Sequence, residues 1–205
     1  MHRSTSFNHL ILLLLCTTLF FAPGEMIAQN LSETLTEFNK QRIGLNTKGM
    51  FVLGSWAATN IAVGTIGYLN SNGSKKYLHQ MNAAWNVVNL AIAGVALHQY
   101  AQVDPASLTF SQSLTKAHNI EKILMINIGL NVAYMATGGY LWERGIRTTS
   151  NRLRGYGQSL LIQGGFLLLF DSTLYLLNRS NNEQLQSIID NVSVTGTQLS
   201  ISIPL

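Results

Sequence analysis

Only 11% of the 205 residues are charged and 47% are hydrophobic, against about 25% charged residues in ordinary soluble domains, a class that this composition disfavours. The net charge of +4 comes from basic residues in short segments between apolar runs, which membrane orientation explains better than nucleic-acid binding does. The one cysteine, Cys16, lies in the first apolar run, so the mature chain has no thiol for disulfide, iron–sulfur, zinc or nucleophile chemistry.

The N-terminal 28 residues have the order of features found in a secretory signal peptide. A short basic segment precedes an apolar run over residues 10–22, and Pro-Gly-Glu at 23–25 interrupts that run before the small residue Ala28. We therefore predict a signal peptide over residues 1–28. An uncleaved first anchor is the alternative, and both interpretations place the following residues outside.

Residues 29–48 alternate charged and apolar side chains at a spacing near 3.6 residues, with Leu31, Leu35 and Phe38 among the apolar ones. This spacing predicts an external amphipathic lead-in that could lie on the outer membrane interface. A loosely structured lead-in is the alternative.

Four long, nearly uncharged runs follow, and we predict that each crosses a membrane as a helix. At 1.5 Å per residue, about 20 residues cover the ~30 Å hydrocarbon core. The predicted fold class is all-α, a polytopic membrane protein with four transmembrane helices in a bundle after the signal peptide. The predicted spans are residues 49–69, 80–101, 120–142 and 156–178, which form a transmembrane domain over 49–178.

Residues 179–205 are predicted to be an external polar tail. A disordered tail is typical of such a terminus, and the alternation Gln-Leu-Ser-Ile-Ser-Ile over 198–203 indicates a short strand as the alternative.

Loop charges predict the orientation, because cytoplasmic loops carry an excess of Lys and Arg. Residues 70–79 and 143–155 are the basic loops and are predicted to be cytoplasmic, with the N- and C-termini periplasmic and the protein in the inner membrane. Anionic lipid headgroups are the expected partners of the four arginines in the second loop, namely Arg144, Arg147, Arg152 and Arg154.

Small residues recur at spacings that let helices approach closely. Gly54, Ala58 and Ala62 recur every fourth residue, and Gly157 and Gly164 are seven residues apart. We predict that these two faces are helix-packing faces, which a second copy of the chain or another membrane protein could use.

The fourth run contains an acidic residue, Asp171, in a heptad with Gly157, Gly164 and Asn178 that faces one way. An ionisable residue at bilayer depth is costly and points to a partner or a function. Asp171 could form a proton-carrying pair with His98 or be an amide-capped packing residue. The candidate intramembrane polar site comprises Asp171, His98, Asn127, Asn131, Asn89 and Asn60.

The amide side chains have two interpretations. Interhelical hydrogen bonds would fix the helix partners and their register. A polar cavity or a solute path between the four helices is the alternative.

Trp and Asn recur in GSWAATNIAVG at 54–64 and in MNAAWNVVNLAIAG at 81–94. Over roughly residues 53–140 the chain resembles a family of small, uncharacterised bacterial polytopic membrane proteins. That resemblance implies a class and a compartment but no activity. A weak internal repeat relates residues 60–69 to residues 131–141 and is consistent with two hairpins of similar design.

The sequence contains no G-x-S-x-G, H-E-x-x-H or P-loop motif and no second intramembrane Asp. No two histidines have metal-ligand spacing. We therefore expect no enzyme activity, metal or cofactor. A structural or accessory membrane component is the favoured function, and a small proton-linked transporter or channel subunit that uses Asp171 is the alternative.

Overall fold

The computed structural model describes the backbone of residues 5–190, 192–195 and 198–201, and the side chains of residues 29, 31–183 and 185. Most of this chain is helical, which confirms the helical class. The elements in chain order are α1 (Thr5–Asn70), α2 (Gly73–Ala101), the 3-10 turn η1 (Pro105–Ser107), α3 (Phe110–Arg147), α4 (Asn151–Asp190), β1 (Val192–Thr195) and β2 (Gln198–Ile201).

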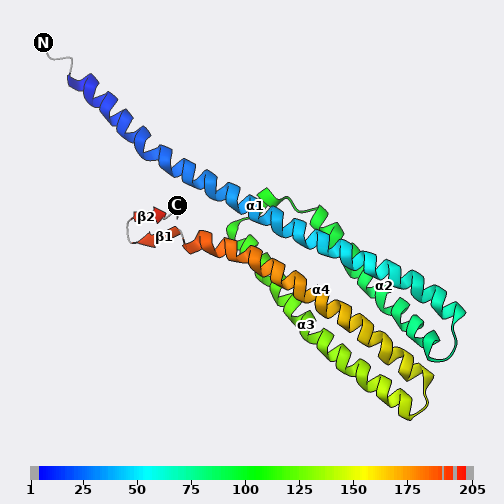
Figure 1. Cartoon of the computed structure of the whole chain (residues 1–205). Coiled ribbons are helices and arrows are strands. Elements are labelled where there is room, and N and C mark those ends of the chain that lie inside the picture. Colours follow the sequence, from blue (N-terminus) through cyan, green and yellow to red (C-terminus); the bar gives the residue numbers. More distant parts are fainter. Residues whose placement is uncertain (1–4, 191, 196–197, 202–205) are drawn as a thin grey trace.

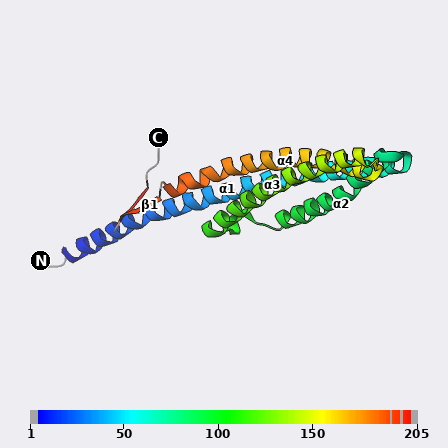
Figure 2. The ribbon, with the colours of Figure 1, turned by 90° about the horizontal axis from the view of Figure 1, so that it is seen from below.

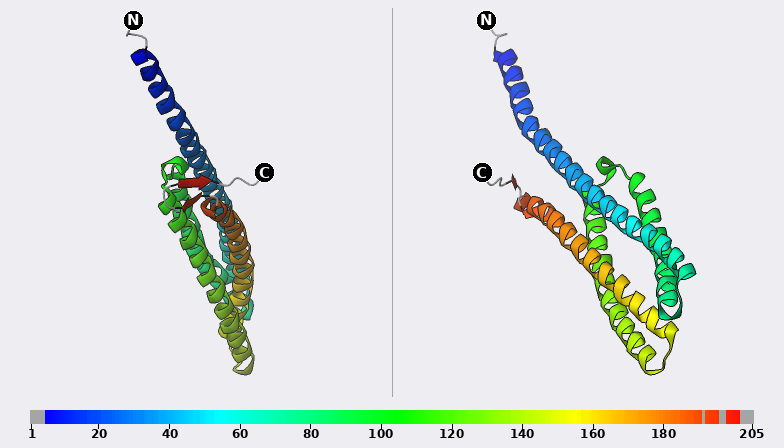
Figure 3. Two further views of the ribbon diagram at one scale, coloured as in Figure 1. Left: turned by 90° about the vertical axis from the view of Figure 1, so that its left-hand side faces the viewer. Right: turned by 45° about the vertical axis from the view of Figure 1, so that its right-hand side comes forward.

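The four helices form two antiparallel hairpins, α1–α2 and α3–α4, which lie alongside each other (Figure 1). The turns of both hairpins lie at the same end of the bundle, where Gly73 faces Asn151 (Figure 2). The N-terminal part of α1 extends beyond the other helices (Figure 3). The two predicted basic loops therefore share one end of the molecule.

Helix α1 is longer than the sequence predicts, because its backbone is helical without interruption from Thr5 to Asn70. It includes residues 5–28 of the predicted signal peptide, the lead-in and the first predicted span. The backbone of residues 23–25 is helical, although Pro-Gly-Glu interrupts the apolar run in the sequence. The signal peptide itself stays a prediction.

The connections between helices are shorter than expected. Only residues 71–72 join α1 to α2, and residues 148–150 join α3 to α4. Helix α3 begins ten residues before the predicted span, at a capping box in which the Thr109 side chain accepts from the Gln112 backbone and Gln112 bonds back to Thr109. Two otherwise unpaired donors are satisfied in this way, which stabilises the early start.

The C-terminal residues also differ from the favoured prediction. Helix α4 continues to Asp190, and β1 and β2 pair antiparallel with Val192 opposite Ile201. The short strand that was the alternative for this segment is present over 198–201, whereas residues 202–205 lie outside the described part.

Many side chains in the interior of the bundle are polar, and many on its outer surface are large and apolar. Among the described side chains, fourteen polar or charged residues are buried, against ten hydrophobic ones. Large apolar side chains point outward on all four helices, and Leu69 and Leu169 are 74% and 72% exposed. This arrangement is the reverse of a soluble protein, in which buried polar residues are the exception.

Two helical segments are long and apolar enough to cross a membrane on length and composition, residues Leu31–Asn70 of α1 and Asn151–Glu183 of α4. This criterion alone is weak support for membrane association, because a buried helix of a soluble protein can also meet it.

Helices α3 and α4 meet along two buried heptad rows, as the seven-residue spacing on the last run predicts. Small residues occupy the rows near the turn, and larger ones occupy the far end. The rows are Ala117, Leu124, Asn131, Gly138 and Gly145 on α3, and Gly157, Gly164, Asp171, Asn178 and Leu185 on α4.

Candidate functional site

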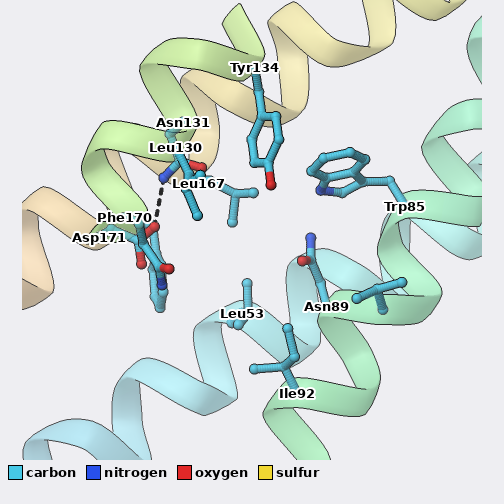
Figure 4. Close-up of a pocket in the computed structure, with 12 residues that line it drawn as sticks. Leu53, Trp85, Asn89, Ile92, Leu130, Asn131, Tyr134, Leu167, Phe170 and Asp171 are labelled. Carbon is cyan, nitrogen blue, oxygen red and sulfur yellow. Dashed lines mark hydrogen bonds between the residues drawn. The ribbon is translucent and has the colours of Figure 1, made fainter. Parts of the chain in front are cut away.

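A cavity of about 260 Å³ lies in the middle of the bundle, and all four helices contribute to its wall (Figure 4). Aromatic and aliphatic side chains surround a small group of polar ones. The lining residues are Leu53 from α1, Trp85, Val88, Asn89 and Ile92 from α2, Asn127, Leu130, Asn131 and Tyr134 from α3, and Leu167, Phe170 and Asp171 from α4.

Asp171 is the only ionisable carboxyl group in this wall, and only 5% of it is exposed. Asn131 Nδ2 donates to Asp171 Oδ2 over 2.7 Å, and Asn127 lines the same part of the cavity. The heptad positions of α3 and α4 bring Asn131 and Asp171 together across the helix seam. The ion pairs of the described residues all lie on the surface, so none of them gives Asp171 a cationic partner.

Trp85 and Tyr134 close one side of the cavity. Their rings meet edge to face with centroids 4.9 Å apart and planes at 83°. This side-chain contact joins α2 and α3, whose backbones do not pack directly against each other in the described part of the chain. Val88 and Ile92 of α2 also line the cavity, and both side chains are more than half exposed. The cavity therefore opens sideways between α2 and α3.

A second polar cluster lies nearer the turns, around the buried Gln163 of α4. Its Oε1 accepts from Trp56 Nε1 over 3.0 Å, and its Nε2 donates to Asn82 Oδ1 over 3.3 Å and Asn60 Oδ1 over 3.5 Å. Ser159 donates to the same oxygen of Asn82. The predicted site residue Asn60 belongs to this cluster and does not line the cavity.

A third polar cluster lies toward the other end of the bundle and includes residues of the predicted external lead-in. Asn46 and Asn178 exchange side-chain hydrogen bonds of 2.8 and 3.2 Å. Asn39 Nδ2 donates to Ser113 Oγ, and Arg42 Nη2 donates to Asn39 Oδ1, each over 2.8 Å.

Arg42 in this cluster is 2% exposed, and burial lowers the pKa of its guanidinium group. The lead-in is thus a helix with one face buried against protein, rather than a loose segment. The spacing of Asn39, Arg42 and Asn46, which puts these three residues on one helical face beside Phe38, could have indicated this.

The structure does not bring His98 to the site. His98 is exposed and lies near the end of α2. It is nine residues beyond Asn89, so the two side chains point to opposite sides of the helix and lie ~13 Å apart along its axis. The predicted pair of His98 with Asp171 is therefore absent from the described structure, while Asn89, Asn127, Asn131 and Asp171 meet at one cavity.

The predicted packing residues separate into two groups. Gly157 and Gly164 are buried against α3, where an added Cβ at Gly157 would lie 2.5 Å from the Gly138 carbonyl oxygen. That face is filled within the chain and cannot accept another protein. Gly54 approaches Ala93, but Ala58 and Ala62 are exposed.

The fold and the cavity define a protein of long helices with a polar core and an apolar surface. The chain belongs to a family of unknown function, DUF6992, whose sequence pattern matches residues 52–172. Every residue that lines the cavity lies within that range. No characterised protein and no solved structure matches the chain. Membership agrees with the expected uncharacterised family and leaves the bacterial origin and the number of membrane crossings as predictions.

Proposed function

We propose that the chain is an integral membrane protein with four crossings, over residues 49–69, 80–101, 120–142 and 156–178, and that its role is structural or accessory. The reversed distribution of polar and apolar residues carries this proposal. Many interior amides hydrogen-bond one another, while many large apolar side chains on the proposed spans are exposed. Lipid would solvate such a surface, and water would not.

Helices α2 and α3 fit this placement although neither of them contains a stretch that meets the length and composition criterion. Their amides point inward, and Asn82, Asn86, Asn89 and Asn131 are buried. Their outward faces carry large apolar residues that are more than half exposed, namely Val87, Val88, Ile92 and Val95 on α2 and Ile123, Met125, Ile126 and Val132 on α3. An average over consecutive residues hides this division between the inward and outward faces.

The charges at the two ends support the proposed orientation. At the end with the turns, one acidic residue, Glu143, accompanies six basic ones. The opposite end has nearly equal numbers of both signs. An excess of Lys and Arg marks the cytoplasmic side, and the six residues are Lys75, Lys76, Arg144, Arg147, Arg152 and Arg154.

Insertion of a topology reporter into the connections tests this proposal. Reporters after Asn72 and Asn151 should be cytoplasmic, and one after the exposed residue Gln102 should be periplasmic. Carbonate washing should leave the chain in the membrane, and detergent should extract it. A chain released by carbonate, or three reporters on the same side, would refute the proposed placement.

Transport is the second candidate function, because Asp171 lines a cavity with polar clusters on both sides of it along the bundle. In this version, Asp171 would carry protons in a small transporter or channel subunit. Asp171→Asn should leave folding intact and abolish proton-coupled flux in liposomes, whereas Asn178→Ala on the same helix should retain it. Full flux in the Asp171→Asn protein would exclude this function.

A further inference from the structure

We propose that the cavity binds a primary ammonium group carried on an alkyl chain, with the ammonium at Asp171 and the chain leaving between α2 and α3. This inference rests on the proposed membrane placement. It concerns a binding site and requires no transport.

The Asp171 carboxyl group lies in the wall of the cavity. It is 5% exposed and opens on a cavity with no basic residue in its wall. A buried acid is expensive to retain without a cation. The described residues include no group of three or more His, Cys, Asp or Glu that could hold a metal ion. An organic cation supplies the missing charge with a single carboxylate as its counter-ion.

The other residues that line the cavity are also suited to binding an ammonium group. Trp85, Tyr134 and Phe170 present aromatic side chains to the cavity, and aromatic faces attract cations. Asn89 extends into the space from α2, and its amide oxygen can accept from an ammonium N–H (Figure 4). The carboxyl group, the amide oxygen and the aromatic faces together would hold the charged head of a ligand.

The opening of the cavity indicates where the alkyl chain of the ligand would lie. Val88 and Ile92 of α2 and Leu130 of α3 line the cavity and are 60%, 53% and 44% exposed. These residues give the mouth an aliphatic surface that faces the proposed lipid. At about 260 Å³, the cavity is just below the usual range of small-molecule sites, ~300–1,000 Å³. It therefore suits a headgroup and the first carbons of a chain rather than a whole lipid.

The test measures quenching of tryptophan fluorescence in the full-length protein, reconstituted in phosphatidylcholine vesicles, by a bromoalkylammonium. Saturable quenching is expected, and Trp85→Phe should remove it because Trp85 lines the cavity. The bromoalcohol of the same chain length should bind at least about tenfold more weakly, equivalent to ~1.4 kcal/mol. Equal binding of the ammonium and the alcohol would overturn the proposal without any variant.

Asp171→Asn should weaken binding of the bromoalkylammonium by at least about tenfold and change binding of the bromoalcohol by less than about twofold. Asn178→Ala is the matched control, because it removes a buried polar group from the same helix outside the cavity and should bind as the wild type does. Wild-type affinity in a folded Asp171→Asn protein would overturn the proposal.

Two further measurements identify the source of the ammonium group and test the membrane placement separately from the ligand. Competition by added phosphatidylethanolamine would assign the site to a lipid headgroup, and its absence would assign the site to a free alkylamine. Lipids brominated on their acyl chains test the membrane placement. No quenching by these lipids would refute the proposed function, whereas quenching without ammonium preference would refute only the ligand.

Discussion

At the scale of single residues, the interior is held by side-chain amides that bond to one another across helices. The Asn46–Asn178 pair is the clearest case, because each amide both donates to and accepts from the other and both residues are almost fully buried. An amide without its partner in this position would retain unpaired polar atoms, since lipid and aliphatic neighbours offer no hydrogen bond.

A double-mutant cycle on this pair should therefore show a favourable coupling. Asn46→Ala and Asn178→Ala should each destabilise the bundle, and the double variant should lose less than the sum of both losses. Interhelical bonds in membrane proteins average ~0.6 kcal/mol with a maximum near 1.7 kcal/mol, which sets the expected coupling. Reversible unfolding in mixed micelles measures it, and strictly additive losses would contradict a direct bond.

At the scale of elements, the α3–α4 seam depends on glycines near the turn. A Cβ at Gly157 would lie 2.5 Å from the Gly138 carbonyl oxygen and closer still to the Trp142 nitrogen. Both are backbone atoms, which cannot move aside as the end of a side chain can. The helices could accommodate a methyl group only by separating.

Gly157→Ala should destabilise the bundle by ~1–3 kcal/mol, the usual cost of overpacking. Gly165→Ala is a matched control on the same helix, because nothing lies within 4 Å of its added Cβ. It should be neutral or stabilising by up to ~1 kcal/mol, since alanine favours helix. Chemical denaturation of both purified variants compares them, and equal stabilities would contradict the close approach.

The sequence predicted the parts of this fold that repeat regularly. Heptad spacing identified the inward face of α4, and the helical class followed from four long apolar runs. The contacts across helices were harder to predict. His98 was assigned to the site by depth alone, while rotation about the α2 axis puts it on the wrong side. Arg42 was overlooked because a charged residue in an amphipathic segment normally faces water, and only the positions of α3 and α4 reveal its burial.

At the scale of the whole molecule, the asymmetry of charge should determine how the bundle interacts with lipid headgroups. Arg144 and Arg147 are exposed at the end with the turns, whereas Lys122 and Arg179 are exposed at the opposite end. Each basic residue near an anionic surface contributes ~1 kcal/mol of attraction.

Arg144→Gln with Arg147→Gln should therefore reduce the stabilisation that phosphatidylglycerol gives to the protein in phosphatidylcholine vesicles. The expected reduction is ~2 kcal/mol at low salt and less at high salt, because salt screens surface charges. Lys122→Gln with Arg179→Gln is the control pair. Thermal unfolding with and without the anionic lipid measures the effect. Equal losses of lipid-dependent stabilisation for both pairs would contradict a preference of the anionic lipid for the end with the turns.

The exposed side chains of helix α1 change from polar to apolar between residues 31 and 70. Over residues 31–41 the exposed positions are mostly polar, and the buried Phe38 packs with Ala117 and Leu185. Over residues 50–70 the exposed positions include Phe51, Val63 and Ile66. A single continuous helix is thus suited to two solvents. In the proposed placement the boundary between water and lipid falls near residues 42–49. Helices α1, α3 and α4 continue beyond this boundary, and the C-terminal β1–β2 hairpin that follows α4 would lie outside the bilayer.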